Sequence, residues 1–133
     1  MKILLDTHIL IWFLQGNGAL SPATRQIIID AEEIYYSIIS IFEIELKHAV
    51  RPEKMPDITE KILKLCEKSD FIQLPLEIPH ILELKNLKRR EDAPPHKDPF
   101  DKLLLCQAIA ENMIFMTHDK LIAGYISPSV CKV

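Results

Sequence analysis

The sequence predicts an α/β fold of three layers, α/β/α, in which helices cover both faces of a mostly parallel central sheet. Short apolar runs rich in β-branched and aromatic residues alternate with longer stretches of helical periodicity. The short runs are apolar throughout rather than at every second residue. This pattern is typical of strands that are buried on both faces, as in a parallel sheet.

Four runs have the length and composition of strands, and a fifth is a candidate edge strand. The four strands are expected at residues 2–5, 34–37, 71–74 and 114–116, and the edge strand at residues 130–133. Seven longer stretches are predicted to be helices, at residues 8–15, 22–31, 40–50, 57–68, 76–87, 99–112 and 120–125. Glycines and X-Pro pairs separate them.

The chain is expected to form one domain, residues 1–133, because no repeat or linker divides it and this length supports a real core. Apolar residues make up 48% and charged residues 26%, the balance of a soluble globular protein. The longest apolar run, residues 34–42, is far shorter than the roughly 20 residues of a membrane span. Asp6 interrupts the first apolar stretch too early for a secretory signal. We therefore expect a cytoplasmic protein with no membrane partner.

Cysteines and overall charge indicate no specialised class. The three cysteines have no disulfide or zinc spacing. A net charge of −3 disfavours an electrostatic grip on nucleic acid over the whole surface. Residues 85–102 form a local basic region, however, and a solvated loop explains it as well as a nucleic-acid contact does.

Four acidic residues fall near the points where predicted strands give way to helices. Asp6 follows the first strand, Asp119 follows the fourth, Glu43 lies at the start of the third helix, and Asp101 opens the helix of residues 99–112. Because the carboxyl ends of parallel strands share one edge of a sheet, we expect these acids to converge there.

Each acid also has a structural interpretation as a helix cap. Ser40 and Glu43 have the spacing of a capping box, and Asp98 before Pro99 has the pattern of an N-cap. Joint placement nevertheless favours a cation, because clustered carboxylates repel one another and an unpaired buried charge is costly.

Carboxylate ligands without paired histidines or cysteines favour Mg²⁺ or Mn²⁺ over Zn²⁺. Such ions support phosphodiester hydrolysis. Packing is expected for Trp12 and Phe13. The five histidines fit no metal-binding spacing, and surface or packing roles are expected for them, with His96 and His118 nearest to the acids.

Four segments carry these residues in order along nearly the whole chain. They are LLDTH at residues 4–8 with Trp12, SIFEI at 40–44 with Lys47, HKDPFDKLL at 96–104, and MTHD at 116–119. Together they resemble the PIN domain family, and more narrowly the VapC toxins of VapBC-type toxin–antitoxin pairs. The HKDPFDK stretch at this distance from the other segments is the most specific part of the resemblance.

The resemblance implies a PIN-like α/β/α fold and Mg²⁺- or Mn²⁺-dependent endoribonuclease activity. It also implies homodimer formation and control by a cognate antitoxin. Asp6, Glu43, Asp101 and Asp119 match the family's catalytic, metal-binding acids, with Asp6 and Asp101 expected to touch metal directly.

Other positions carry over as supporting residues. Thr7 and Thr117 match hydroxyl positions that orient metal-bound water, and for Asp98 capping is favoured over ligation. Lys97 and Lys102, expected to bind substrate, stand where many relatives carry arginine. Lysine keeps the charge but loses the bidentate geometry toward phosphate.

Other functions remain open on the sequence alone. One is a catalytically idle PIN-like module that binds an antitoxin or RNA. A receiver-like signalling domain would need paired acids after the first strand, where only Asp6 stands, and a haloacid-dehalogenase-like phosphatase would need an acid at His8. The helices at residues 58–65 and 76–87 fit either a groove for an antitoxin helix or ordinary core packing.

Overall fold

The computed structural model describes all of residues 1–133, and its five strands form one parallel sheet in the order β3-β2-β1-β4-β5. The strands are β1 (Lys2–Leu5), β2 (Glu33–Ser37), β3 (Ile72–Leu74), β4 (Ile114–Thr117) and β5 (Val130–Lys132). The predicted parallel sheet is confirmed, and the candidate edge strand pairs with β4.

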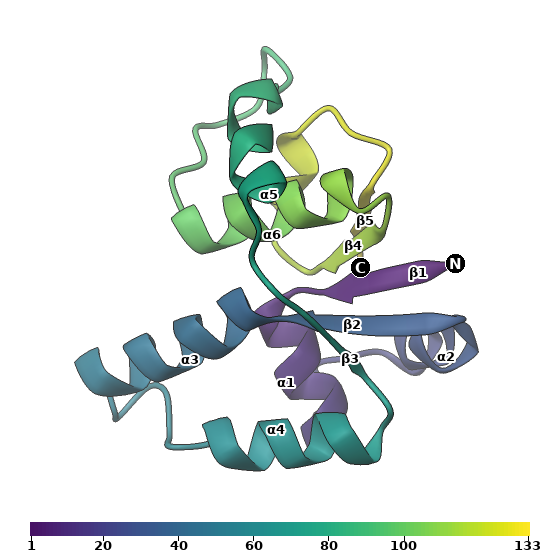
Figure 1. Cartoon of the computed structure of the whole chain (residues 1–133), viewed down its shortest axis with the longest axis vertical. Coiled ribbons are helices and arrows are strands. Elements are labelled where there is room, and N and C mark those ends of the chain that lie inside the picture. Colours follow the sequence, from purple (N-terminus) through teal and green to yellow (C-terminus); the bar gives the residue numbers. More distant parts are fainter.

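Six α-helices complete the three predicted layers. Figure 1 shows α1, α2 and α4 on one face of the sheet and α5 and α6 on the other, while α3 extends outward from the end of β2. The helices are α1 (Thr7–Gln15), α2 (Pro22–Asp30), α3 (Ile38–Val50), α4 (Thr59–Lys68), α5 (Ile78–Leu82) and α6 (Pro99–Ala110). None of them has both the length and the apolar character that crossing a membrane requires.

The central strand β1 divides the apolar core into two clusters. Ile3 and Leu5 belong to the cluster under α1, α2 and α4, whereas Leu4 points to the opposite cluster with α6. All three side chains are fully buried. Alternate residues of a strand face opposite sides, so an unbroken apolar run at β1 reflects burial on both faces.

Two of the predicted helices are shorter than expected. Residues 76–87 form the short α5 followed by a 3₁₀ helix, η1 (Glu83–Asn86), a common way for a helix to end. Residues 120–125 contain only a 3₁₀ turn, η2 (Ile122–Gly124). Gly124 lowers helix propensity there, and Pro128 follows closely.

Candidate active site

The acids gather at the point where the strand order of the sheet reverses. β1 pairs with β2 on one side and with β4 on the other. The first half of the chain therefore adds its strands on one side of β1, and the second half adds its strands on the other side. A parallel sheet opens a crevice at the carboxyl ends of its strands at such a switch point. Asp6 directly follows β1 and Asp119 lies just after β4, which places both acids at this crevice.

Asp6 is held by the first residue of α1 and the last residue of β4. Its Oδ1 accepts a hydrogen bond from the backbone N–H of Thr7 (2.7 Å), and its Oδ2 accepts one from the hydroxyl of Thr117 (2.6 Å). Burial raises the pKa of the Asp6 carboxyl, although both hydrogen bonds oppose the shift. Asp6 also caps α1, so the capping role coexists with its position in the crevice.

Glu43 reaches the crevice from inside α3 rather than from its first residues. The helix begins directly after Ser37, whose hydroxyl accepts a hydrogen bond from a backbone N–H of the first turn (3.0 Å). The predicted capping box of Ser40 and Glu43 is therefore wrong. Instead the Thr7 hydroxyl donates to Glu43 Oε1 (2.7 Å) and lies 2.9 Å from the Ser40 hydroxyl oxygen.

Lys47 places a positive charge beside Glu43, one turn further along α3. Its ammonium donates to Glu43 Oε2 in an i,i+4 ion pair, and the Glu43 side chain is only 3% exposed. Burial lowers the pKa of the Lys47 ammonium, but the Glu43 carboxylate more than offsets this, so the pKa lies above its usual value. Lys47 therefore stays charged and compensates one buried carboxylate.

Asp98 and Asp101 come from the start of α6. Asp98 is the N-cap expected from its position before Pro99, and its Oδ1 accepts hydrogen bonds from the backbone N–H groups of Phe100 (2.9 Å) and Asp101 (3.2 Å). Burial and the charges of nearby carboxylates, Asp6 first among them, raise the pKa of Asp101 to about 9. A carboxyl so perturbed needs a cation beside it to ionise readily at neutral pH.

A cavity of about 300 Å³ joins these side chains. Trp12 forms part of its wall, with the rings of His8 and His118 centred 5.8 and 5.4 Å away. Trp12 was expected only in packing, so the cavity adds a second role for it. The full lining is Asp6, His8, Trp12, Glu43, Lys47, Asp98, Asp101, His118 and Asp119.

The remaining expected residues lie around the cavity rather than in its lining. Thr7 and Thr117 are buried beneath the acids, where their hydroxyls bind Glu43 and Asp6. Lys97 is exposed, and Lys102 borders a separate pocket. The predicted substrate-binding lysines are thus absent from the cavity wall.

Sequence reasoning assigned no site role to Lys47 or His96. The i,i+4 spacing of Glu43 and Lys47 is a usable signal, because residues four apart on a helix are neighbours. His96 turns inward, with its Nε2 3.5 Å from Asp101 Oδ2. Burial lowers the pKa of His96, which favours the neutral ring.

The residues of the cavity fit a hard divalent cation. Five carboxylates line it and Lys47 is the single lysine among its lining residues, so negative charge is in excess. Carboxylate oxygens are the ligands that Mg²⁺ and Mn²⁺ prefer. Ligand atoms of His96, Asp101 and Asp119 lie within 4.8 Å of one another. The raised pKa of Asp101 has the same cause, because burial and the neighbouring carboxylates disfavour a further negative charge in the cavity.

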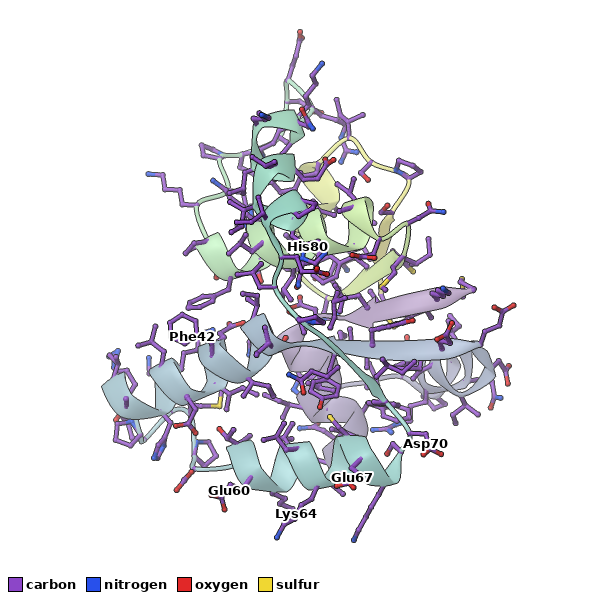
Figure 2. The ribbon with its side chains drawn as sticks, in the orientation of Figure 1. Phe42, Glu60, Lys64, Glu67, Asp70 and His80 are labelled. Atoms are coloured by element: carbon purple, nitrogen blue, oxygen red, sulfur yellow. The ribbon has the colours of Figure 1, made fainter.

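A second cluster, formed by Glu77, His80 and Glu111, has internal partners for both nitrogens of its histidine. His80 is labelled in Figure 2 and lies in α5. Its Nδ1 accepts from the backbone N–H of Glu77 (3.0 Å), and its Nε2 lies 2.8 Å from Glu111 Oε1. The ring therefore joins the start of α5 to the end of α6.

Comparison with known proteins agrees with this geometry. The family model described as the PIN domain matches residues 3–125. No curated protein matches the chain significantly in sequence. The family match offers no support for the receiver-like or dehalogenase-like alternatives.

Three solved structures share the fold. VapBC2 from Rickettsia felis, bound to a DNA fragment from its promoter, is 16% identical, with a TM-score of 0.66 over 100% of this chain and 98% of that chain. DNA-bound VapBC from Salmonella typhimurium is 15% identical, with a TM-score of 0.64 over 100% and 97% of the two chains. FitAcB from Neisseria gonorrhoeae is 18% identical, with a TM-score of 0.53 over 92% of each chain.

Proposed function

The chain belongs to the PIN domain family, and we propose that it is a Mg²⁺- or Mn²⁺-dependent endoribonuclease that hydrolyses phosphodiester bonds of RNA. One observation carries the proposal: Asp6, Glu43, Asp101 and Asp119, which are distant in sequence, line one cavity at the switch point of the sheet. Asp98 also lines it, and its main role in the proposal is to cap α6.

The four acids would hold the metal, with Asp6 and Asp101 as direct ligands. A bound divalent cation lowers the pKa of water and neutralises charge that develops on the phosphoryl group. Thr7 and Thr117 fix the orientations of Glu43 and Asp6 through their hydrogen bonds. Lys47 forms an ion pair with Glu43 at the edge of the cavity.

A neighbouring pocket supports a path for the RNA strand. It has a volume of about 440 Å³ and shares His8 and Lys47 with the acidic cavity. Its other lining residues are Leu46, Val50, Arg51, Lys54 and Met55. Apolar side chains suit a nucleobase and cations suit its phosphates, so we propose this pocket as a contact with substrate in addition to Lys97 and Lys102.

The proposed biological role is that of a cytoplasmic toxin controlled by a cognate antitoxin. The VapBC assemblies among the similar structures support this assignment. Exposed apolar side chains on α3 outside the pocket proposed for RNA, Ile38 (41% exposed) and Phe42 (57% exposed), support a protein partner. We propose that the antitoxin and a second copy of the chain are its partners and that residues 1–133 act as one domain.

The test is cleavage of transfer RNA, ribosomal RNA and single-stranded DNA by the purified protein in Mg²⁺, Mn²⁺ and EDTA. We expect cleavage of RNA with metal and none with EDTA. Asp6→Asn and Asp101→Asn should each lower the rate by at least about 100-fold, because each loses a charged ligand, while circular dichroism shows that both fold. Asp57→Asn, a change at an exposed acid, is the matched control.

The main alternative is a catalytically idle module that binds RNA or an antitoxin. It predicts tight binding without turnover at any metal concentration. The presence of all four acids around one cavity favours the nuclease. Cleavage in Mn²⁺ by both asparagine variants at the parent's rate would contradict the acidic-site assignment.

A further inference from the structure

His96 contains a buried polar atom that has no partner. The His96 side chain is 1% exposed, and its Nε2 makes no hydrogen bond in the structure. The atom points toward the acids, with Asp101 Oδ2 at 3.5 Å. Buried polar groups are nearly always paired, so this orphaned nitrogen calls for a physical explanation.

The other ring nitrogen determines which tautomer faces the acids. His96 Nδ1 lies 2.7 Å from the hydroxyl oxygen of Tyr125, and the two rings meet edge to face. Burial raises the pKa of Tyr125, so its hydroxyl keeps its proton. In the arrangement that we infer, the Tyr125 hydroxyl donates this hydrogen bond to His96 Nδ1. In a neutral ring the hydrogen then resides on Nε2.

Tyr125 is in turn fixed by Arg89, which belongs to the basic region of residues 85–102. The guanidinium lies over the Tyr125 ring, 4.6 Å from its centroid. It also donates to the backbone carbonyls of Leu121 (2.9 Å) and Pro94 (2.6 Å). A side chain at Gly124 would displace the Arg89 guanidinium, because its Cβ would lie 2.5 Å from Arg89 Nη2. At least one cation of the basic region is therefore a packed structural group.

We propose, building on the nuclease assignment, that His96 is a positioning residue for Asp101. The unpartnered Nε2 lies 3.5 Å from Asp101 Oδ2, so an Nε2–H donor would hold this oxygen and fix the orientation of the carboxyl group toward the cavity. Carboxylate ligands are commonly held in this way by a neighbouring donor, and loss of such a donor weakens metal binding about 10- to 100-fold. Contacts thus run from the basic region to the proposed metal site, through Arg89, Tyr125, His96 and Asp101 in that order.

The first experiment compares Mg²⁺ binding by calorimetry in His96→Leu, His96→Gln and the parent. The glutamine amide can donate from nearly the position of Nε2, whereas leucine fills the space without a donor. We expect His96→Leu to weaken Mg²⁺ binding by about 10-fold or more and His96→Gln to stay within about threefold of the parent. Melting temperatures in EDTA show whether either variant has lost its fold.

Equal Mg²⁺ affinity in all three proteins would overturn the proposal. Equal weakening in both variants would overturn it too, because it would indicate that ring shape or direct nitrogen ligation matters rather than the donor. If RNA cleavage is absent while the expected order of Mg²⁺ affinities holds, the nuclease assignment fails and the positioning role stands.

A second measurement needs no metal. Nitrogen-15 chemical shifts of the His96 ring report which nitrogen carries hydrogen. We expect the Nε2–H tautomer in the parent and a loss of this preference in Tyr125→Phe. Tyr35→Phe, which removes a hydroxyl bonded to Glu33 instead, serves as the control. An Nδ1–H tautomer in the parent would contradict the proposal.

Discussion

At the scale of the single residue, burial favours the protonated form of Asp101, whereas the proposed metal binding requires its carboxylate. Its side chain is only 11% exposed and lies among other carboxylates, which raises its pKa from 3.8 to about 9. The folded chain therefore binds a proton at Asp101 more tightly than the unfolded chain does. Without metal, stability from this group is full below about pH 4 and is lost as the pH rises toward 9.

Replacing Asp101 with asparagine should relieve this cost. At about pH 8 in EDTA we expect Asp101→Asn to raise the free energy of unfolding by about 1–3 kcal/mol, because the parent must bind a proton at Asp101 on folding that its unfolded chain lacks at this pH, whereas asparagine needs none. At about pH 5 the difference should be smaller. Urea unfolding at both pH values measures it, with the exposed Asp92→Asn as the matched control. A variant less stable than the parent at both pH values would contradict the electrostatic explanation.

The acids were predictable from sequence at this scale, whereas their partners were not. Asp6 and Asp119 follow short apolar strands directly, so strand positions locate them. His96 and Tyr125 meet across 29 positions of the chain, in a loop and at the end of a 3₁₀ turn, where no periodicity predicts a contact. Trp12 was expected to pack because its helix is apolar; it does pack against the core, but it also lines the cavity, which the apolar pattern does not predict.

At the scale of elements, Asp98 at the start of α6 has two candidate roles, helix cap and metal ligand, which substitutions can distinguish. We expect Asp98→Ala to cost about 1 kcal/mol of unfolding free energy, because two backbone N–H groups lose their acceptor. Asp98→Ser keeps a capping oxygen, so its free energy of unfolding should stay within a few tenths of a kcal/mol of the parent's. Urea denaturation checks both values.

Metal binding by the same pair of variants tests the assignment of Asp98 as a cap. With capping as its main role, Asp98→Ser should bind Mg²⁺ within about threefold of the parent in calorimetry. A loss comparable to that of Asp101→Asn would make Asp98 a ligand.

At the scale of elements, long periodic segments were predicted well and their ends less well. The predicted strands and the helices at α1, α2, α4 and α6 are confirmed within a few residues. The start of α3 was misplaced because Ser37 and Ser40 are both good caps, and only tertiary contacts choose between them. Ser40 lies against Thr7 of α1, so Ser37 caps the helix.

At the scale of the whole molecule, the acidic cavity and the neighbouring pocket lie side by side and form the proposed surface for RNA. Arg51 and Lys54 are exposed on this surface, and the surface ion pair of Arg51 with Glu53 competes weakly with phosphate. We expect the double variant Arg51→Ala/Lys54→Ala to raise KM for RNA about 10-fold with kcat within about twofold, since it removes two phosphate contacts remote from the chemistry.

Lys64→Ala/Lys68→Ala is the matched control, because it removes the same charge elsewhere. Both lysines are exposed on α4, and Figure 2 shows Lys64 pointing away from the sheet. Steady-state cleavage of a labelled oligonucleotide at several salt concentrations gives both constants. An equal rise in KM in the two double variants would assign the effect to net charge instead of to this pocket.

The pairing of β4 with the other side of β1 also has a consequence for a ribosome making this chain. The hydrogen bond from Thr117 to Asp6 joins residues 111 positions apart, so the cavity cannot close until nearly all of the chain has left the exit tunnel. Contacts of such long range form late in folding. A growing chain thus carries Asp6 and Glu43 near its ribosome well before it carries a working centre, and the translation apparatus is not exposed to the proposed activity while the protein is being made.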